Sequence, residues 1–191
     1  MTVFRAHWLA PWFNHPFLAT ELTEHGLLLH LKGEQQPLAW HELNAVPHLE
    51  PGRRLYRLRL LCTQGVVELG WLPKSVAEEL QHAITLSWYR YHSARILPLA
   101  QSCLALLEEG YLRDSRWQQL QSMLQQEPLD WSQLPLPCGL SDQDAAAFEL
   151  VATLMAADDE WREQCCDDYC EQMLAEHAEL FDTLERHPLT P

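Results

Sequence analysis

Basic side chains in the first half of the chain are the residues best suited to bind another molecule. Four arginines fall between residues 53 and 59, and a lysine follows near the end of the next predicted strand. Guanidinium groups bind phosphates, and tryptophan rings close by offer faces on which unpaired bases stack. The candidate nucleic-acid-binding residues are Arg53, Arg54, Arg57, Arg59, Lys74 and Trp71, with Trp40 as a second ring. The alternative is that the arginines are the solvent-facing side of a half-buried strand and that both tryptophans belong to the core.

Cysteines in the second half invite a zinc interpretation. The thiols and one imidazole are Cys138, Cys165, Cys166, Cys170 and His177. Structural zinc sites usually present cysteine pairs in tight turns, whereas Cys166 and Cys170 are separated by one helical turn. Together with Met173, His177, Phe181 and Leu184 they repeat at the spacing of one helix face, which favours buried thiols over a metal centre. The acidic runs 158–160 and 167–168 lack the glycine turn of a calcium loop, and a solvated helix face is the preferred interpretation.

Signatures of known catalytic sites are absent from the sequence. The chain has 7 glycines and no Gly-Lys-Ser/Thr sequence, so it contains no phosphate-binding loop. It also contains no G-x-S-x-G elbow, no H-E-x-x-H pair and no dinucleotide fingerprint. Cys62 and Cys103 lie among apolar neighbours, where nothing marks a nucleophile. We therefore expect no catalytic residue, no cofactor and no metal in this chain, and no enzymatic activity of its own.

The elements that would position the arginines are short strands. Residues 27–31 form an apolar run between two glycines, and strands are also predicted at 37–40 and in a short run ending at Val46. Residues 55–62 alternate between apolar and basic side chains, which predicts a half-buried strand. A turn at 63–65 then leads into a partner strand that ends at Trp71, which completes a hairpin.

After Pro73 the period becomes helical. Ser75 and Glu78 have the spacing of a capping box, and a helix is predicted from there to Glu109, with a kink or break at Pro98. A shorter helix is expected over 113–126, and prolines 128, 135 and 137 mark a loop. Ser141 should cap a long helix that reaches about Glu185, with the 75–109 helix as its antiparallel partner or with a break along its length.

Charge and composition separate the same two regions. Residues 1–100 carry nine basic and eight acidic side chains, a balance of +1, whereas residues 101–191 carry four and nineteen, a balance of −15. An acidic surface repels phosphates, so the second region should not itself bind nucleic acid. We expect an α+β chain: a β-rich region with a small antiparallel sheet over 1–72, then an all-helical acidic region with long antiparallel helices over 73–191. Strands followed by one helix also resemble the pleckstrin-homology-like fold.

Targeting signals are not evident. No apolar run approaches the roughly 18 residues that a membrane span requires. The first residues lack the charged-then-apolar order of a signal peptide. We expect a cytoplasmic protein with no membrane partner.

The C-terminal segment carries the most specific motif. It reads Tyr169-Cys-Glu-Gln-Met173-Leu174-Ala-Glu176-His-Ala178-Glu-Leu-Phe181 and then Glu185-Arg-His-Pro188-Leu189-Thr-Pro191. It is similar to a segment of bacterial DNA helicase IV, a superfamily 1 helicase. There, a Tyr-x-Glu-x-Met-Leu-x-Glu-x-Ala-like helix runs into a Pro-Leu-Asn-Pro sequence that opens the glutamine motif of the ATPase core. Thr190 replaces the usual Asn, and the chain stops just before the expected Gln.

Upstream segments resemble the same family in a matching order. They are Trp40-His-Glu-Leu-Asn-Ala-Val46, the arginine-rich strand, the hairpin to Trp71, Trp88-Tyr-Arg-Tyr91 and Leu134-Pro-Leu-Pro137. The resemblance implies that these residues are the non-catalytic N-terminal accessory region of an ATP-dependent 3′-to-5′ DNA helicase. None of the family's core motifs lies in this chain, so ATP and Mg²⁺ would belong to the core of the parent protein.

The expected partners follow from these two lines of reasoning. The first hypothesis is a module that helps to position the helicase core on DNA, with DNA bound weakly or through the core. The second is that the acidic helices dock on a basic surface, either of the helicase core or of a DNA-processing or transcription complex such as RNA polymerase. A structural spacer that braces the core is the third.

Overall fold

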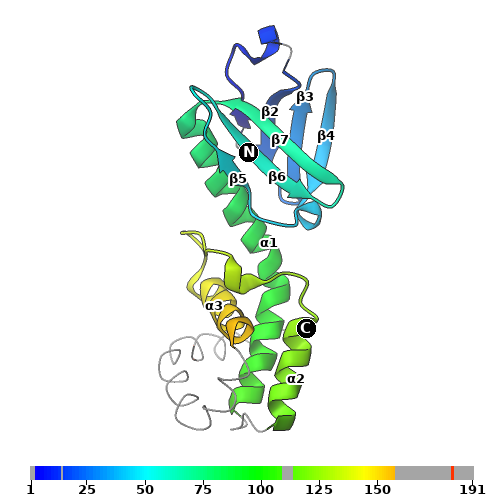
Figure 1. The fold of residues 1–191 in the computed structure, drawn as a ribbon, viewed down its shortest axis with the longest axis vertical. Helices are drawn as coiled ribbons and strands as arrows, with labels where there is room; N and C mark the ends of the chain where they lie inside the picture. The colour runs from blue at the N-terminus through cyan, green and yellow to red at the C-terminus, as the bar shows by residue number, and fades with distance from the viewer. Residues whose placement is uncertain (1–2, 14, 109–113, 158–181, 183–191) are drawn as a thin grey trace. The chain divides into compact units, whose positions relative to one another are not determined.

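The fold is α+β. The computed structural model describes residues 3–13, 15–108, 114–157 and 182, and within these ranges seven strands form two antiparallel sheets and precede most of the helices (Figure 1). The strands are β1 (Val3–Arg5), β2 (Phe17–Leu22), β3 (Gly26–Leu31), β4 (Glu34–Ala39), β5 (His48–Glu50), β6 (Tyr56–Cys62) and β7 (Gly65–Leu72). The helices are α1 (Lys74–Glu108), α2 (Asp114–Gln125) and α3 (Asp142–Ala156), with 3-10 turns η1 (Ala10–Phe13), η2 (Trp40–Glu42) and η3 (Trp131–Gln133).

The first sheet is a meander in the order β1-β2-β3-β4. The predicted strand at 27–31 is confirmed as β3, and Gly33 makes the turn into β4 with a φ of 91°, which favours glycine. Phe17, Leu27 and Leu29 point inward and are buried. Sequence reasoning missed β1 and β2, and the run ending at Val46 is not a strand, because Leu43 makes only an isolated bridge to Cys62.

The second sheet has the order β5-β6-β7. The alternation predicted for residues 55–62 is confirmed, since Leu58, Leu60 and Cys62 are buried while Arg57 and Arg59 are exposed. The predicted hairpin is confirmed as well, with Cys62 opposite Gly65 at the turn. The strands are followed by a helix, as expected for an α+β chain.

Helix α1 differs from the prediction at two points. It begins at Lys74, so Ser75 lies in the first turn and is not the N-cap. It continues through Pro98 without the break that the proline suggested. The predicted end at Glu109 and Gly110 lies outside the described residues. Pro98 and Ala94, whose carbonyl the proline cannot satisfy, are both exposed, so water can take the missing hydrogen bond.

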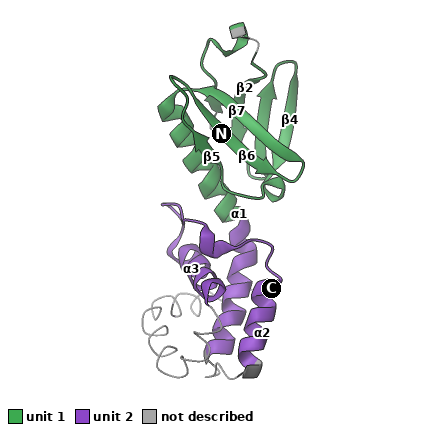
Figure 2. Ribbon diagram, viewed as in Figure 1, with its two compact units in different colours: residues 1–91 green, residues 92–191 purple. Residues whose placement is uncertain are grey.

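The described chain divides into two compact units, residues 1–91 and 92–191 (Figure 2). The secondary structure changes at residue 73 as expected, but the compact units divide eighteen residues later, because the first half of α1 packs with the strands. Leu80, Ile84 and Trp88 are fully buried, and the indole Nε1 of Trp88 donates to the Leu43 carbonyl at 3.0 Å. One helix thus contributes to both cores.

Unit 2 is helical where it is described. The second predicted helix is confirmed as α2, and Ser141 caps α3 as expected by accepting from the Asp144 amide at 3.1 Å. A continuous helix to about Glu185 is wrong, because α3 ends at Ala156 and Ala157 is extended, with φ −67° and ψ 131°. In the core, the rings of Trp131 and Phe148 pack with centroids 4.7 Å apart. Residues 158–181 and 183–191 lie outside the described residues.

Candidate nucleic-acid interface

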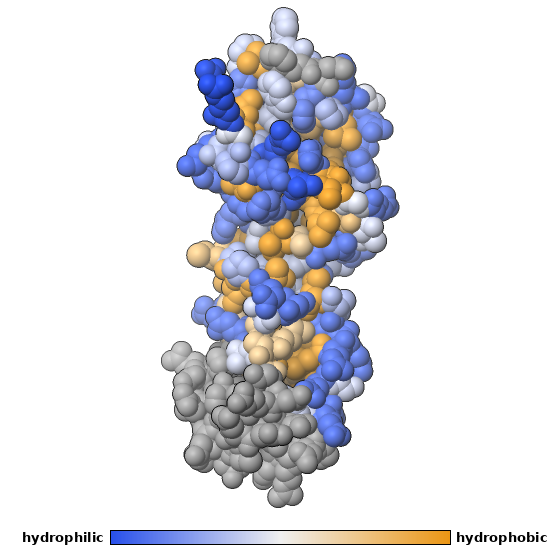
Figure 3. All heavy atoms as spheres, in the orientation of Figure 1, coloured by the Kyte–Doolittle hydropathy of each residue, from blue (hydrophilic) through white to orange (hydrophobic). Residues whose placement is uncertain are grey.

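Five of the six candidate residues lie on or beside the second sheet. Arg57 and Arg59 point outward from β6, and Arg53 and Arg54 are exposed in the turn that leads into it. Trp71 lies in β7, and Lys74 is the first residue of α1. Figure 3 shows strongly hydrophilic side chains over this sheet.

Two of the basic side chains already have carboxylate partners. The Arg59 guanidinium contacts Glu50 at 3.0 Å and Glu68 at 3.5 Å, and Lys74 contacts Glu78 at 3.7 Å. Arg53, Arg54 and Arg57 form no ion pair with any residue that the structure describes. These three arginines are therefore the cations of the cluster best able to pair with an incoming phosphate.

Trp71 lies in a β-bulge. Tyr56 pairs with Leu72 and Leu58 with Leu69, so Gly70 and Trp71 together face Arg57. Trp71 has a φ of 59°, which a bulky residue rarely adopts. Its side chain is half-buried.

The bulge is held by the segment before β2. The Trp71 carbonyl accepts from the His7 amide at 2.6 Å, and the His15 ring lies 6.1 Å from the Trp71 ring. A Cβ at Gly70 would approach His15 Nε2 to 2.7 Å, so a larger residue there would force the imidazole to shift.

Trp40 cannot serve as a stacking face. Its side chain is 1% exposed, and its Nε1 donates to the Glu24 carbonyl at 3.0 Å. For this ring the core interpretation is correct, because Trp40, the first residue of η2, is buried.

Two tryptophans that sequence reasoning did not single out are the most exposed large apolar side chains of the described residues. Trp8 is 71% exposed and Trp12 is 81% exposed, and both lie in the segment between β1 and β2. Their signal in the sequence was a pair of tryptophans four residues apart in a stretch bounded by Pro16 and without strand alternation.

The described thiols do not form a reactive or metal-binding group. Burial raises the pKa of Cys103 to about 12 and, with the nearby Glu42 carboxylate, raises that of Cys62, so both thiols stay protonated near neutral pH. Cys138 is exposed. In the parts of the chain described, no three histidine, cysteine or acidic residues gather as metal ligands. Four members of the proposed zinc set, Cys165, Cys166, Cys170 and His177, lie outside the described residues.

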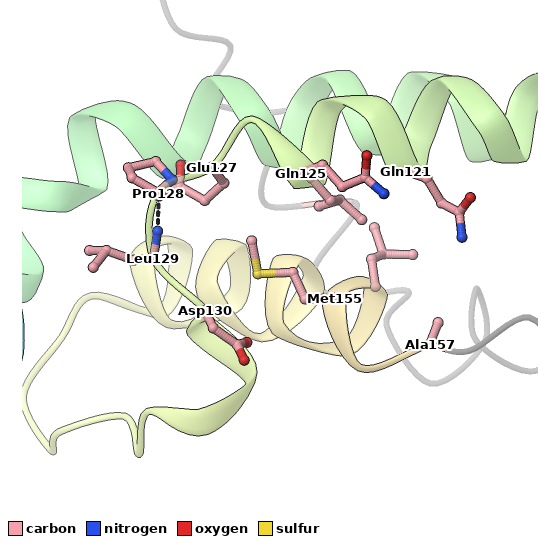
Figure 4. A pocket seen from close by; sticks show the side chains of 10 residues that line it. Gln121, Gln125, Glu127, Pro128, Leu129, Asp130, Met155 and Ala157 are labelled. Carbon is pink, nitrogen blue, oxygen red and sulfur yellow. Dashed lines mark hydrogen bonds between the residues drawn. The ribbon is translucent and has the colours of Figure 1, made fainter.

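Unit 2 contains a cavity of about 370 Å³ between α2, the loop after it and the end of α3 (Figure 4). Leu124, Leu154 and Met155 line its apolar part, and Gln121 and Gln125 border it. The Glu127 carboxylate at its edge is engaged, since it accepts from Arg95 Nη1 at 2.5 Å and from the Leu129 amide at 3.4 Å. Among the described residues that line it, there is no histidine, cysteine, serine or lysine.

Comparisons with known proteins leave the site to be interpreted on its geometry. No family model, curated protein or solved structure matches the chain. Among the described helices, none is long and apolar enough to cross a membrane.

Proposed function

We propose that this chain is a non-catalytic accessory module of a DNA helicase IV-like ATP-dependent 3′-to-5′ helicase, and that unit 1 helps to position the helicase core on DNA. The observation that carries the DNA-binding part is the group Arg53, Arg54 and Arg57, which are exposed and have no described carboxylate partner. The link to a helicase rests on the motif at residues 169–191.

The chemistry of this role is electrostatic. Each guanidinium that pairs with a phosphate releases condensed counterions, so binding is driven by entropy and weakens steeply with salt. Contacts of this kind hold and orient a strand without reading its sequence. ATP hydrolysis would be supplied by the parent core with Mg²⁺, and this chain would supply affinity.

The test is a salt titration of binding with matched variants. Fluorescent single-stranded DNA is titrated with the chain, with Arg53→Gln/Arg54→Gln and with Arg90→Gln/Arg116→Gln. Both variants lose two positive charges, but the control pair lies on helices α1 and α2 and not on β6 or the turn that leads into it. The first variant should flatten the slope of log K against log salt by about 1.4, from roughly 0.7 per phosphate contact on single strands.

The possible results distinguish binding at the arginines from a general effect of net charge. Saturable binding that weakens only in Arg53→Gln/Arg54→Gln supports the proposal. An equal loss in both variants would mean that net charge alone acts, and the proposed surface would be rejected. Absence of any binding by the unmodified chain at low salt would also reject it.

A further inference from the structure

The segment from Ala6 to Pro16 presents two indole rings to solvent. Figure 1 shows this segment, in dark blue, extending beyond the strands at one end of unit 1. Trp8 and Trp12 are exposed by 71% and 81%, although tryptophan is usually among the well-buried residue types. Tryptophan is enriched among the residues of binding interfaces.

The rings are carried on an ordered support. Ala10 is completely buried, and its carbonyl accepts from the His15 amide at 3.1 Å. The His7 amide is bonded to the Trp71 carbonyl, and His15 Nδ1 accepts from the Phe17 amide at 3.3 Å. Because the backbone is fixed at both ends and at its centre, the indoles lose little conformational freedom when a ligand binds.

Basic residues adjoin this support in the chain and through backbone pairing. Arg5 immediately precedes the segment, and the Lys32 amide donates to the Pro16 carbonyl at 2.8 Å. Arg53 and Arg54 lie just before Tyr56, which pairs with Leu72. Leu72 follows Trp71, whose carbonyl accepts from the His7 amide. Glu34, opposite Leu31 in β4, and Glu50, opposite Arg57 in β5, bring carboxylates to the same ends of the two sheets.

We infer that Trp8 and Trp12 form a stacking platform for the unpaired bases of single-stranded DNA. The basic side chains of Arg5, Arg53 and Arg54 would contact its phosphates. This inference rests on the proposed function and specifies its ligand. Aromatic rings beside a basic surface are the usual means of binding single strands, because every base has a stacking face. Inside a duplex the bases are already stacked, so the platform would favour single strands. An interfacial membrane anchor would combine tryptophan with exposed aliphatic side chains, whereas here Ala10 is buried and Leu9 is half-buried.

The experiment separates stacking from charge by changing the bases and leaving the phosphates. The chain and Trp8→Ala/Trp12→Ala are titrated with an oligothymidine, with an abasic oligonucleotide of the same length and with a duplex. The unmodified chain should prefer the oligothymidine to the abasic strand by roughly 5- to 150-fold for each stacked base. The alanine variant should lose that preference and keep its affinity for the abasic strand. Trp8→Phe/Trp12→Phe should restore part of the preference, which argues against a folding defect.

Three results would overturn the inference. The first is equal affinity of the unmodified chain for the normal and abasic strands. The second is a uniform loss on all DNA ligands in the alanine variant. The third is binding to phosphatidylserine vesicles through the two tryptophans with no preference for bases. If salt-dependent binding persists without a base preference, the accessory DNA-binding role stands and only the platform fails, whereas no DNA binding at all removes both.

Discussion

Lowering the pH from 7 to 5 should destabilise unit 2 through His92. This side chain is 9% exposed, and its Nδ1 accepts from Arg95 Nη2 at 2.9 Å. Arg95 is a permanent cation, so it bonds the neutral imidazole and repels the protonated one. Burial is the larger cause and Arg95 the smaller, and together they lower the pKa of His92 to about 4 from 6.5. Glu127 offsets part of that repulsion through its ion pair with Arg95, and Trp131 covers another side of the ring.

The size of the effect follows from proton linkage. A group whose folded pKa is depressed binds more protons in the unfolded chain, so it stabilises the fold above the unfolded pKa and loses that contribution as pH falls toward the folded pKa. With a pKa of about 4 in the fold and 6.5 in the unfolded chain, the loss between pH 7 and pH 5 is about 2 kcal/mol. The full effect, reached below pH 4, is about 3 kcal/mol.

The assay is urea denaturation at pH 7 and pH 5, with His92→Gln as the matched variant. Glutamine keeps an acceptor for Arg95 and does not titrate, so the variant should lose about 2 kcal/mol less than the wild type over this interval. Comparing each protein with itself removes the cost of the substitution. NMR titration of the imidazole gives the pKa directly. A wild-type loss equal to that of the variant, or a His92 pKa near 6.5, would refute the reasoning.

Two further predictions concern the free energy of unfolding, measured by urea denaturation. Trp88→Phe leaves the Leu43 carbonyl without its 3.0 Å hydrogen bond and should lower this free energy by about 1–3 kcal/mol. Trp12→Phe, on an exposed ring, should change it by less than about 0.5 kcal/mol, and similar values for both would contradict the anchoring role of Trp88. Ser141→Ala removes the cap of α3 and should lower the free energy of unfolding by about 1 kcal/mol. Ser102→Ala, on the exposed side of α1, is the control, and an unchanged denaturation midpoint for both serine variants would show that the cap contributes nothing.

The sequence predicted the elements whose pattern is local. Alternation over residues 56–62 gave β6 and its facing sides, glycines 33 and 65 marked turns, and Ser141 marked the start of α3. Long elements were less well predicted, because α3 stops where Ala157 becomes extended and α1 tolerates Pro98 on a solvent-exposed side. Neither outcome is encoded in a short window, since each depends on what surrounds the helix.

The candidate site shows the same division. Residue types and spacing alone identified the arginine cluster, because Arg57 and Arg59 are two residues apart on one strand and must share a face. Pairing between strands decided which of them have carboxylate partners. Register placed Glu68 opposite Arg59, and Glu50, which lies opposite Arg57 in the register, forms its ion pair with Arg59 instead. Only the tertiary structure shows which tryptophans are buried: Trp40 lies in the core, whereas Trp8 and Trp12 are exposed. A tryptophan has the same composition signal in a core and on a surface, and only packing against the rest of the chain distinguishes the two.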